Sequence, residues 1–265
     1  MAKNYLLIMV PNTGIVHTEF MKSLIGLTQS LREKNMPFLL KTVEFSDIVM
    51  SRNYLLSFFL SDERFSHALF IDSDLSFAPV QFFRLFDFDA DFVAATYPNR
   101  RLSDRILKAL WQGQKEAPTD LPEGELITKT MAGAMHYLVT RHANQHASLP
   151  EEQKDGFHTV AGIAGGFSLL KRIVPEKMVQ EGAARLLPRL GQLEIYKDAP
   201  RFADFFSHLP TDENQALLGE DQSFCKRWVQ GCGGKIWVDG DSCLVHHGDF
   251  AFKGEYAHSP QNIVS

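Results

Sequence analysis

Apolar and polar positions alternate in blocks along the first hundred residues, and the blocks predict strands and helices in turn. Short apolar runs bounded by polar residues are typical of buried strands, whereas apolar residues at spacings of three and four predict helices. The segment after residue 17 shows the helical spacing, with Phe20, Leu24 and Leu27 in register. The predicted strands are 5–10, 38–43, 68–71 and 92–95, and the predicted helices are 18–32, 48–60 and 79–86. Strands that alternate with helices predict an α/β protein with a mostly parallel sheet and helices on both of its faces.

The second part of the chain is less regular. Polar segments with proline and glycine at 112–126, and a similar segment at 142–156, predict loops. Apolar character returns at 157–170, and Pro175 suits the first position of a helix over 175–187. The remaining predicted elements are a helix at 221–229 and strands at 236–238 and 244–246. Because there is no repeat and no clear linker, we expect a single domain over residues 1–265.

Composition and charge narrow the class of protein. The chain has 265 residues, of which 45% are hydrophobic, enough for a substantial core. Its net charge of −5 makes a nucleic-acid partner unlikely. The cysteines, Cys225, Cys232 and Cys243, are few and odd in number, which favours reduced thiols and a cytoplasmic location. They form no C-x-x-C pair, which argues against a zinc site. The apolar run at 5–10 is too short for a membrane span or a signal peptide, so we expect no transmembrane segment.

The segment HALFIDSDLSF, residues 67–77, carries the strongest chemical signal. Its apolar run ends at Asp72-Ser73-Asp74, which places both carboxylates at the C-terminal end of a strand, where open α/β sheets bind ligands. Two neighbouring carboxylates repel each other, and a Mg²⁺ or Mn²⁺ ion that also holds phosphates relieves this repulsion. The structural alternative is that an aspartate caps the helix that begins near Pro79.

Two further segments hold candidate functional residues. In AGIAGGF, residues 161–167, Gly165 and Gly166 allow the backbone to approach a substrate closely, and the alternative is a tightly packed or bulged strand. At the start of a predicted helix, Glu220 or Asp221 is suited to act as a catalytic base, and the alternative is an ordinary acidic first turn.

The paired histidines near the end of the chain are candidate metal ligands. His246 and His247 follow an apolar run and precede Gly248. An imidazole at a strand end is a common ligand for a divalent metal ion, although a single histidine is usually structural.

The order of these motifs resembles a GT-A-fold glycosyltransferase, a Rossmann-like enzyme that uses a nucleotide sugar and a divalent metal. The motifs are VPNTG, SRN, FIDSDLSF, TYPNRR, AGIAGGFSLLKR, GEDQSFCKRWVQGCGGKIWVD and LVHHGDFAFKG. The resemblance runs from about Val10 to Gly254 without the middle loops, and it does not select one named family. It implies a nucleotide-binding half over 1–100 and an irregular acceptor-side half, with the metal-binding histidine, over 101–265.

The resemblance also implies roles for the metal-site residues. Asp74 would bind Mn²⁺ or Mg²⁺ directly, and Asp72 would hold the ribose or a metal-bound water. His246, in the H-x-G position, would be the further metal ligand, and His247 is the competing choice. The ion would bridge the phosphates of the donor, a nucleoside-diphosphate sugar of the UDP or GDP type.

The remaining implied roles concern the donor pocket and the acceptor. Pro11, Thr13 and Arg52 would line the nucleotide pocket, while Gly165 and Gly166 would lie against the sugar or the acceptor. Asp221, with Glu220 as the alternative, would deprotonate an acceptor hydroxyl in an inverting transfer.

The expected acceptor is a glycan or a glycolipid. The phenylalanines Phe202, Phe205 and Phe206 belong either to the core or to a surface that touches a membrane or a partner subunit. The sequence carries no signal for the oligomeric state.

Three other function classes remain as alternatives. A haloacid-dehalogenase-type phosphatase also uses an apolar strand that ends in D-x-D, with Asp72 as its nucleophile, although such a motif normally lies on the first strand. A non-catalytic module that binds nucleotide sugars would contain the same residues. A sugar-phosphate nucleotidyltransferase would need a basic, glycine-rich loop after the first strand, where this chain has only Gly14.

Overall fold

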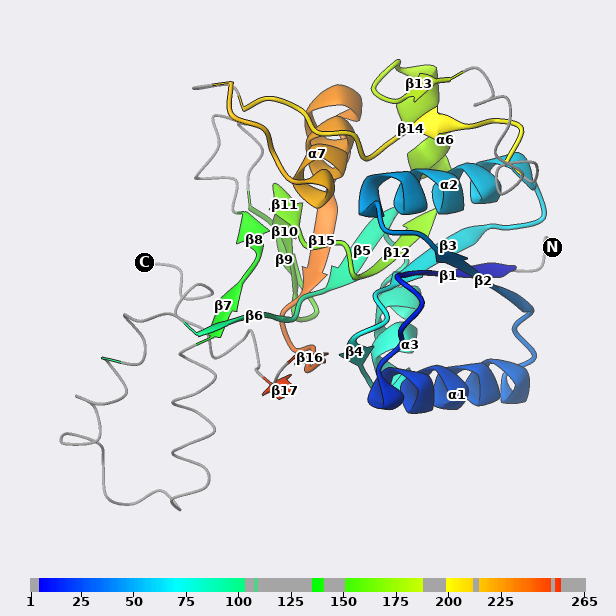
Figure 1. The fold of residues 1–265 in the computed structure, drawn as a ribbon, viewed down its shortest axis with the longest axis vertical. Helices are drawn as coiled ribbons and strands as arrows, with labels where there is room; N and C mark the ends of the chain where they lie inside the picture. Colours follow the sequence, from blue (N-terminus) through cyan, green and yellow to red (C-terminus); the bar gives the residue numbers. More distant parts are fainter. Residues whose placement is uncertain are drawn as a thin grey trace.

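The fold is built on an eight-stranded mixed sheet, with the strands in the order β2-β1-β3-β12-β5-β15-β10-β9 (Figure 1). The structure is a computed structural model that describes residues 5–102, 108, 135–140, 151–187, 199–211, 215–248 and 251–253. The strands are β1 (Leu6–Asn12), β2 (Phe38–Glu44), β3 (His67–Ile71), β5 (Phe92–Ala95), β9 (Gln153–Lys154), β10 (Phe157–Val160), β12 (Phe167–Lys171) and β15 (Ile236–Asp239). Strands β12 and β10 run antiparallel to both neighbours, and the other strands share one direction.

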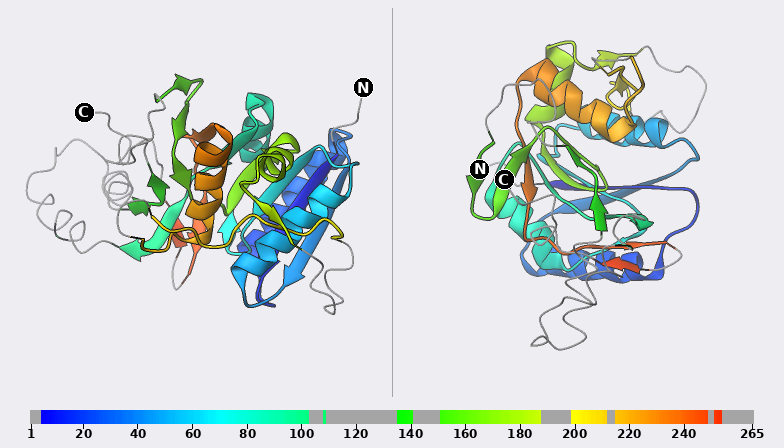
Figure 2. Two further views of the ribbon diagram at one scale, coloured as in Figure 1. Left: turned by 90° about the horizontal axis from the view of Figure 1, so that it is seen from above. Right: turned by 90° about the vertical axis from the view of Figure 1, so that its left-hand side faces the viewer.

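Helices cover both faces of this sheet, as Figures 1 and 2 show. On one face lie α2 (Ile48–Ser61), α6 (Ile173–Gln180) and α7 (Glu220–Lys226), and on the other lie α1 (Thr18–Glu33) and α3 (Pro79–Phe88). In β1, Leu7 and Met9 face α2, whereas Leu6 and Ile8 face α1 and α3, and all four are buried. Burial on both sides explains why the strands read as continuous apolar runs. The predicted fold class, a mostly parallel α/β sheet flanked by helices, is confirmed and is consistent with a Rossmann-like GT-A fold.

The register of the strands decides which loops meet at the carboxyl edge of the sheet. Met9 of β1 pairs with Phe70 of β3, so the D-x-D turn follows beside the end of β1. Phe167 of β12 pairs with Ile71, and the amide of Asp72 donates to the carbonyl of Gly166 at 2.8 Å. The glycine turn before β12 therefore lies directly against the D-x-D turn.

Smaller sheets complete the architecture around this edge. The D-x-D turn leads into β4 (Leu75–Ser76), which pairs with β16 (Val245–His247) so that His246 lies opposite Leu75. The other short strands are β17 (Ala251–Lys253) beside β16, β6 (Pro98–Leu102) with β7 (Met135–Tyr137), β8 (Val139–Thr140) with β11 (Gly162–Ile163), and β13 (Arg185–Leu186) with β14 (Ala203–Asp204).

Several predictions for the second part of the chain were wrong or incomplete. The helix predicted at 175–187 is the shorter α6, because the chain turns at Gly182 with φ of 72° and then enters β13. The helix predicted at 221–229 is α7 followed by a π-helical turn over Arg227–Gly231. The predicted loop at 112–126 lies outside the described residues, and the end of the predicted loop at 142–156 contains β9.

The phenylalanines Phe202, Phe205 and Phe206 belong to the core. Their exposed fractions are 3%, 0% and 2%, and they pack in the cluster beneath α2 and α7. The alternative that they form a surface for a membrane or a partner is therefore wrong. Among the described residues, no helix has both the length and the apolar character that a membrane crossing requires.

Candidate functional site

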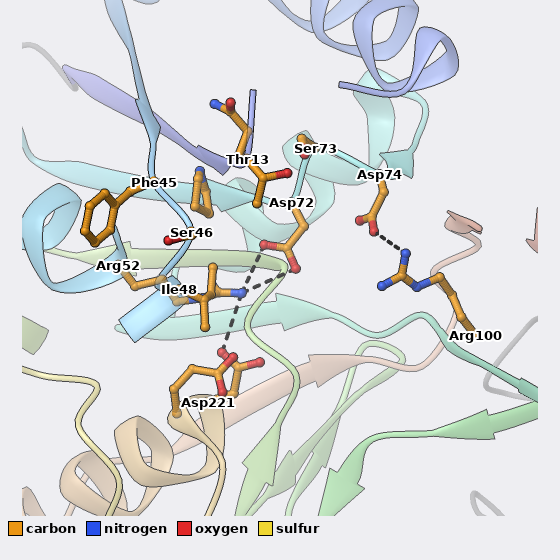
Figure 3. A pocket seen from close by; sticks show the side chains of 13 residues that line it. Thr13, Phe45, Ser46, Ile48, Arg52, Asp72, Ser73, Asp74, Arg100 and Asp221 are labelled. Atoms are coloured by element: carbon orange, nitrogen blue, oxygen red, sulfur yellow. Dashed lines mark hydrogen bonds and ion pairs between the residues drawn. The ribbon is translucent and has the colours of Figure 1, made fainter. Parts of the chain in front are cut away.

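A pocket of about 400 Å³ opens at the carboxyl edge of β1, β2 and β3 (Figure 3). This volume lies within the range of small-molecule sites. Of the residues predicted from the sequence, it is lined by Pro11, Thr13, Arg52, Asp72, Asp74, Glu220 and Asp221. Gly165, Gly166 and His246 do not line the pocket, but each lies against one of its acids.

Arg52 is the centre of the pocket floor. Its side chain is 2% exposed, and its Nη2 lies 3.0 Å from Oδ1 and 3.3 Å from Oδ2 of Asp72. The same nitrogen lies 3.7 Å from Oδ1 of Asp221. One buried guanidinium therefore joins the first acid of the D-x-D turn to the predicted base at the start of α7.

Aromatic rings fix the position of this guanidinium. Its Cζ lies 5.5 Å from the ring centroid of Phe70 and 5.9 Å from that of Phe206. Phe206 is itself held by α2, because its amide donates to Oδ1 of Asn53 at 2.9 Å. Cation–π contacts of this kind gain strength when the cation is removed from water. Arg52 is thus held in place by its surroundings, not only by its ion pairs.

The electrostatics of the pocket floor follow from burial. Burial raises the pKa of both Asp72 and Asp221 above the usual range, and the charge of Arg52 opposes this shift. For Arg52, burial alone would lower the pKa, but the Asp221 and Asp72 carboxylates raise it on balance. The side chains of Asp72 and Asp221 keep 24% and 19% of their surface exposed, so water in the pocket still reaches both acids.

The turn at Gly165 and Gly166 leaves room for the acids. A Cβ added at Gly166 would lie 2.3 Å from Oδ2 of Asp72 and 2.2 Å from Oη of Tyr97, and one added at Gly165 would lie 2.6 Å from Oδ1 of Asp221. The amide of Gly166 also donates to Oη of Tyr97 at 3.0 Å. Close packing therefore explains the need for glycine at both positions, and the contact with a substrate stays a prediction.

The second acid of the D-x-D turn has different partners. Oδ2 of Asp74 lies 3.0 Å from Nη1 of Arg100 and 3.4 Å from Nε2 of His246. Burial acts to raise the pKa of Asp74, but the hydrogen bond to His246 and the charges of His246 and Arg100 lower it on balance. Figure 3 shows Asp74 with Arg100 on one side of the pocket and Asp72 with Arg52 on the other.

The two histidines of β16 differ in their hydrogen bonds. Nδ1 of His246 lies 2.9 Å from the carbonyl of Pro98, which only accepts, so this nitrogen carries a proton, and Nε2 is the ring nitrogen that faces Asp74. His247 instead points to Ser76, with Nε2 2.8 Å from Oγ, and its ring stacks on His17 at 4.0 Å. The geometry therefore favours His246 over His247 as a metal ligand.

Asp74 and His246 are the side chains that would hold a divalent cation, and they form only part of a donor set. Within the described residues, no group of three or more His, Cys, Asp or Glu side chains is placed to hold a metal ion. Asp74 and His246 converge, whereas Asp72 is turned toward Arg52. Mg²⁺ is often bound through one or two carboxylates, with substrate phosphates and water as its other ligands, so Asp74 and His246 would supply only part of its octahedral shell.

Several pocket residues were not predicted from the sequence. Asn12, Phe45, Ser46, Ile48 and Ser73 line the pocket as well. Phe45 and Ser46 follow the end of β2, and the rule that ligands bind at carboxyl ends of strands would have identified them. Tyr97, one residue before β6, does not line the pocket, but its Oη accepts from the amide of Gly166, a contact that the motif TYPNRR did not predict.

Comparisons with known proteins find similarity to solved structures. No family model matches the chain, and no curated protein matches it. The chain is similar to a solved structure described as "Crystal Structure of A197 from STIV", with 16% sequence identity and a TM-score of 0.45. The match covers 92% of this chain and 86% of that chain.

Proposed function

We propose that the protein is a glycosyltransferase that moves a sugar from a nucleoside-diphosphate donor to a hydroxyl acceptor. One observation carries this proposal. The D-x-D turn after β3 and the acidic start of α7, far apart in the sequence, meet at the buried Arg52 in a pocket of suitable size. This arrangement supports a donor side and an acceptor side in one pocket.

On the donor side, Asp74 and His246 would hold Mn²⁺ or Mg²⁺ together with the diphosphate. When bound, such an ion offsets the negative charge that develops on the departing nucleotide. Asp72, held by Arg52, would contact the ribose or a water on the ion. Pro11 and Thr13 at the end of β1 would line the place of the nucleoside.

On the acceptor side, Asp221 would take the proton of the attacking hydroxyl, with Glu220 as the alternative. Burial raises the pKa of Asp221, which makes its carboxylate a stronger base than an exposed aspartate. A carboxylate base supports inversion at the anomeric carbon. Anomer-resolved NMR of the product tests this point, and retention would exclude the base role. A glycan or glycolipid acceptor and a UDP or GDP donor belong to the same proposal.

Calorimetric binding of UDP, GDP, CDP and dTDP, each with and without Mn²⁺, tests the proposal. We expect one nucleotide to bind in a metal-dependent manner and to lose affinity at least about tenfold in Asp74→Asn, because a charged metal ligand is lost. Asp89→Asn is the matched control, since Asp89 is 77% exposed and pairs with Lys171 outside the pocket. Absence of binding by all four nucleotides would refute the proposal and favour the phosphatase alternative, which hydrolysis of an aryl phosphate with Mg²⁺ then tests.

A further inference from the structure

Arg100 already contacts the carboxylate of Asp74, the acid that would bind the metal ion. Its Nη1 lies 3.0 Å from Oδ2 of Asp74, the same oxygen that faces Nε2 of His246 at 3.4 Å. A divalent ion of the Mg²⁺ type lies about 2.1 Å from a carboxylate oxygen. A guanidinium and a divalent ion at this one oxygen would crowd and repel each other, so an ion bound to Oδ2 requires Arg100 to move.

The side chain of Arg100 is placed so that it can move. It is 50% exposed, in contrast to Arg52 at 2%. Among the described residues, its further hydrogen bond is a long one, 3.5 Å from Nη1 to the carbonyl of His247. In the described part of the chain, no aromatic ring packs against the guanidinium of Arg100, whereas Phe70 and Phe206 pack against that of Arg52.

The backbone beside Arg100 also leaves room for this side chain. A Cβ added at Gly248 would lie 2.9 Å from Cδ of Arg100, so the glycine of the H-x-G motif accommodates the stem of the arginine. Arg100 itself lines the pocket, as Asp74 does. A guanidinium released from Asp74 therefore remains within the pocket, where a diphosphate offers it oxygens in a matching geometry.

We propose that Arg100 is an exchangeable partner of Asp74 that competes with the divalent cation and binds the donor diphosphate once the cation has displaced it. This inference rests on the proposed function. It predicts that the ion alone binds weakly, and that the ion and the nucleotide strengthen each other because the nucleotide takes up the released guanidinium. By linkage, the strengthening is the same whichever of the two binds first.

The test is to measure Mn²⁺ binding to wild type and to Arg100→Gln. The electron paramagnetic resonance signal of free Mn²⁺ reports the binding, which is measured without a nucleotide and with UDP, GDP, CDP or dTDP. We expect Arg100→Gln to bind Mn²⁺ alone about two- to fivefold more tightly, which is the range for a half-exposed ion pair. It should bind the nucleotide in the presence of Mn²⁺ about tenfold more weakly, because a charge-assisted contact is lost. Opposite changes in the two affinities are not expected from a simple structural defect.

The control is Arg64→Gln, which changes the net charge by the same amount. Arg64 is 70% exposed and pairs with Asp62, which does not line the pocket. Tighter Mn²⁺ binding in Arg100→Gln but not in Arg64→Gln supports the competition. If Arg100→Gln binds Mn²⁺ no more tightly than wild type while wild type shows Mn²⁺-dependent nucleotide binding, the competition is wrong and the proposed function stands. If no nucleotide binds to either protein, the proposed function and the diphosphate role both fail, and a tighter Mn²⁺ site would support the competition alone.

Discussion

Removal of the Arg52 side chain is the most direct test of how the pocket floor is built. In Arg52→Met, Asp72 and Asp221 lose their shared cation, and the rings of Phe70 and Phe206 lose their cation–π partner. Breaking a buried ion pair by removing one partner costs about 3–5 kcal/mol. Because the two acids keep 24% and 19% of their surface exposed, water can solvate them in part, and we expect the lower end, about 3 kcal/mol. For a chain of this size that corresponds to a fall in Tm of about 6–12 °C.

The pH dependence separates a charge effect from a packing effect. Burial already raises the pKa of Asp72 and Asp221, and the loss of Arg52 should raise both further. A raised folded-state pKa contributes stability that is present below the unfolded value of 3.8 and is lost as the pH rises through the folded value. The deficit of Arg52→Met should therefore be small at low pH and larger at neutral pH. A loss of packing alone would leave it constant.

The assay is thermal and urea unfolding between pH 4 and 8, with circular dichroism as the signal. The matched variant is Arg52→Met combined with Asp72→Asn and Asp221→Asn, which removes the uncompensated charges and should recover more than half of the loss. If Arg52→Met alone lowers the free energy of unfolding by less than about 1 kcal/mol, which is the range of an exposed ion pair, the reasoning is refuted. A combined variant that is no more stable than Arg52→Met would refute it as well.

Three further predictions concern the proposed base and two groups outside the pocket. Asp221→Asn should lower sugar transfer by about 10²–10⁴-fold and leave nucleotide binding nearly unchanged, as calorimetry and product analysis would show, because it removes a base and not a donor ligand. Arg172→Met should lower the free energy of unfolding by about 3 kcal/mol in urea, because its guanidinium donates to four backbone carbonyls at and after the end of α2 at 2.9–3.1 Å. Glu176→Ala, which removes only the ion pair of Arg172, should lower it by less than about 0.5 kcal/mol. Burial and the charge of Lys171 lower the pKa of His67 to about 4. The free energy of unfolding of wild type should therefore fall by up to about 1.4 kcal/mol per pH unit as the pH falls from 6.5 to 4. Urea unfolding of His67→Phe over the same range should show a weaker dependence on pH.

The sheet could be predicted from the sequence where burial on both faces leaves a simple pattern. In β1 and β3 both faces are covered, so the apolar runs are continuous and end where the polar edge begins. The place of β12 could not be predicted, because an apolar strand reads the same whether it runs parallel or antiparallel to its neighbours. The end of α6 was missed because one glycine, Gly182, ends a pattern that otherwise continues.

The pocket acids could be predicted from their positions at element ends, and the resemblance placed Arg52 in the pocket, but its buried ion pairs could not be predicted. The segment Ser51-Arg52-Asn53 reads as the polar face of a surface helix, and yet all three residues are buried. A signal was present, because the rest of α2 is apolar nearly all round and such a helix is usually buried. A polar residue inside a helix of this kind must find a partner, and Arg52 finds Asp72 and Asp221.

The antiparallel insertion of β12 is what allows the two halves of the pocket to share one cation. Because β12 begins beside the end of β3, the turn at Gly165 and Gly166 lies at the carboxyl edge and not at the opposite end of the sheet. Side chains at this turn would fill the space between Asp72 and Asp221, as the 2.3 Å and 2.6 Å distances from added Cβ atoms show. The glycines therefore keep the acids close enough for a single guanidinium, and the acids in turn require a buried and immobile one. Arg100, exposed and held mainly by Asp74, has the opposite properties, which suit a residue that changes partners during binding.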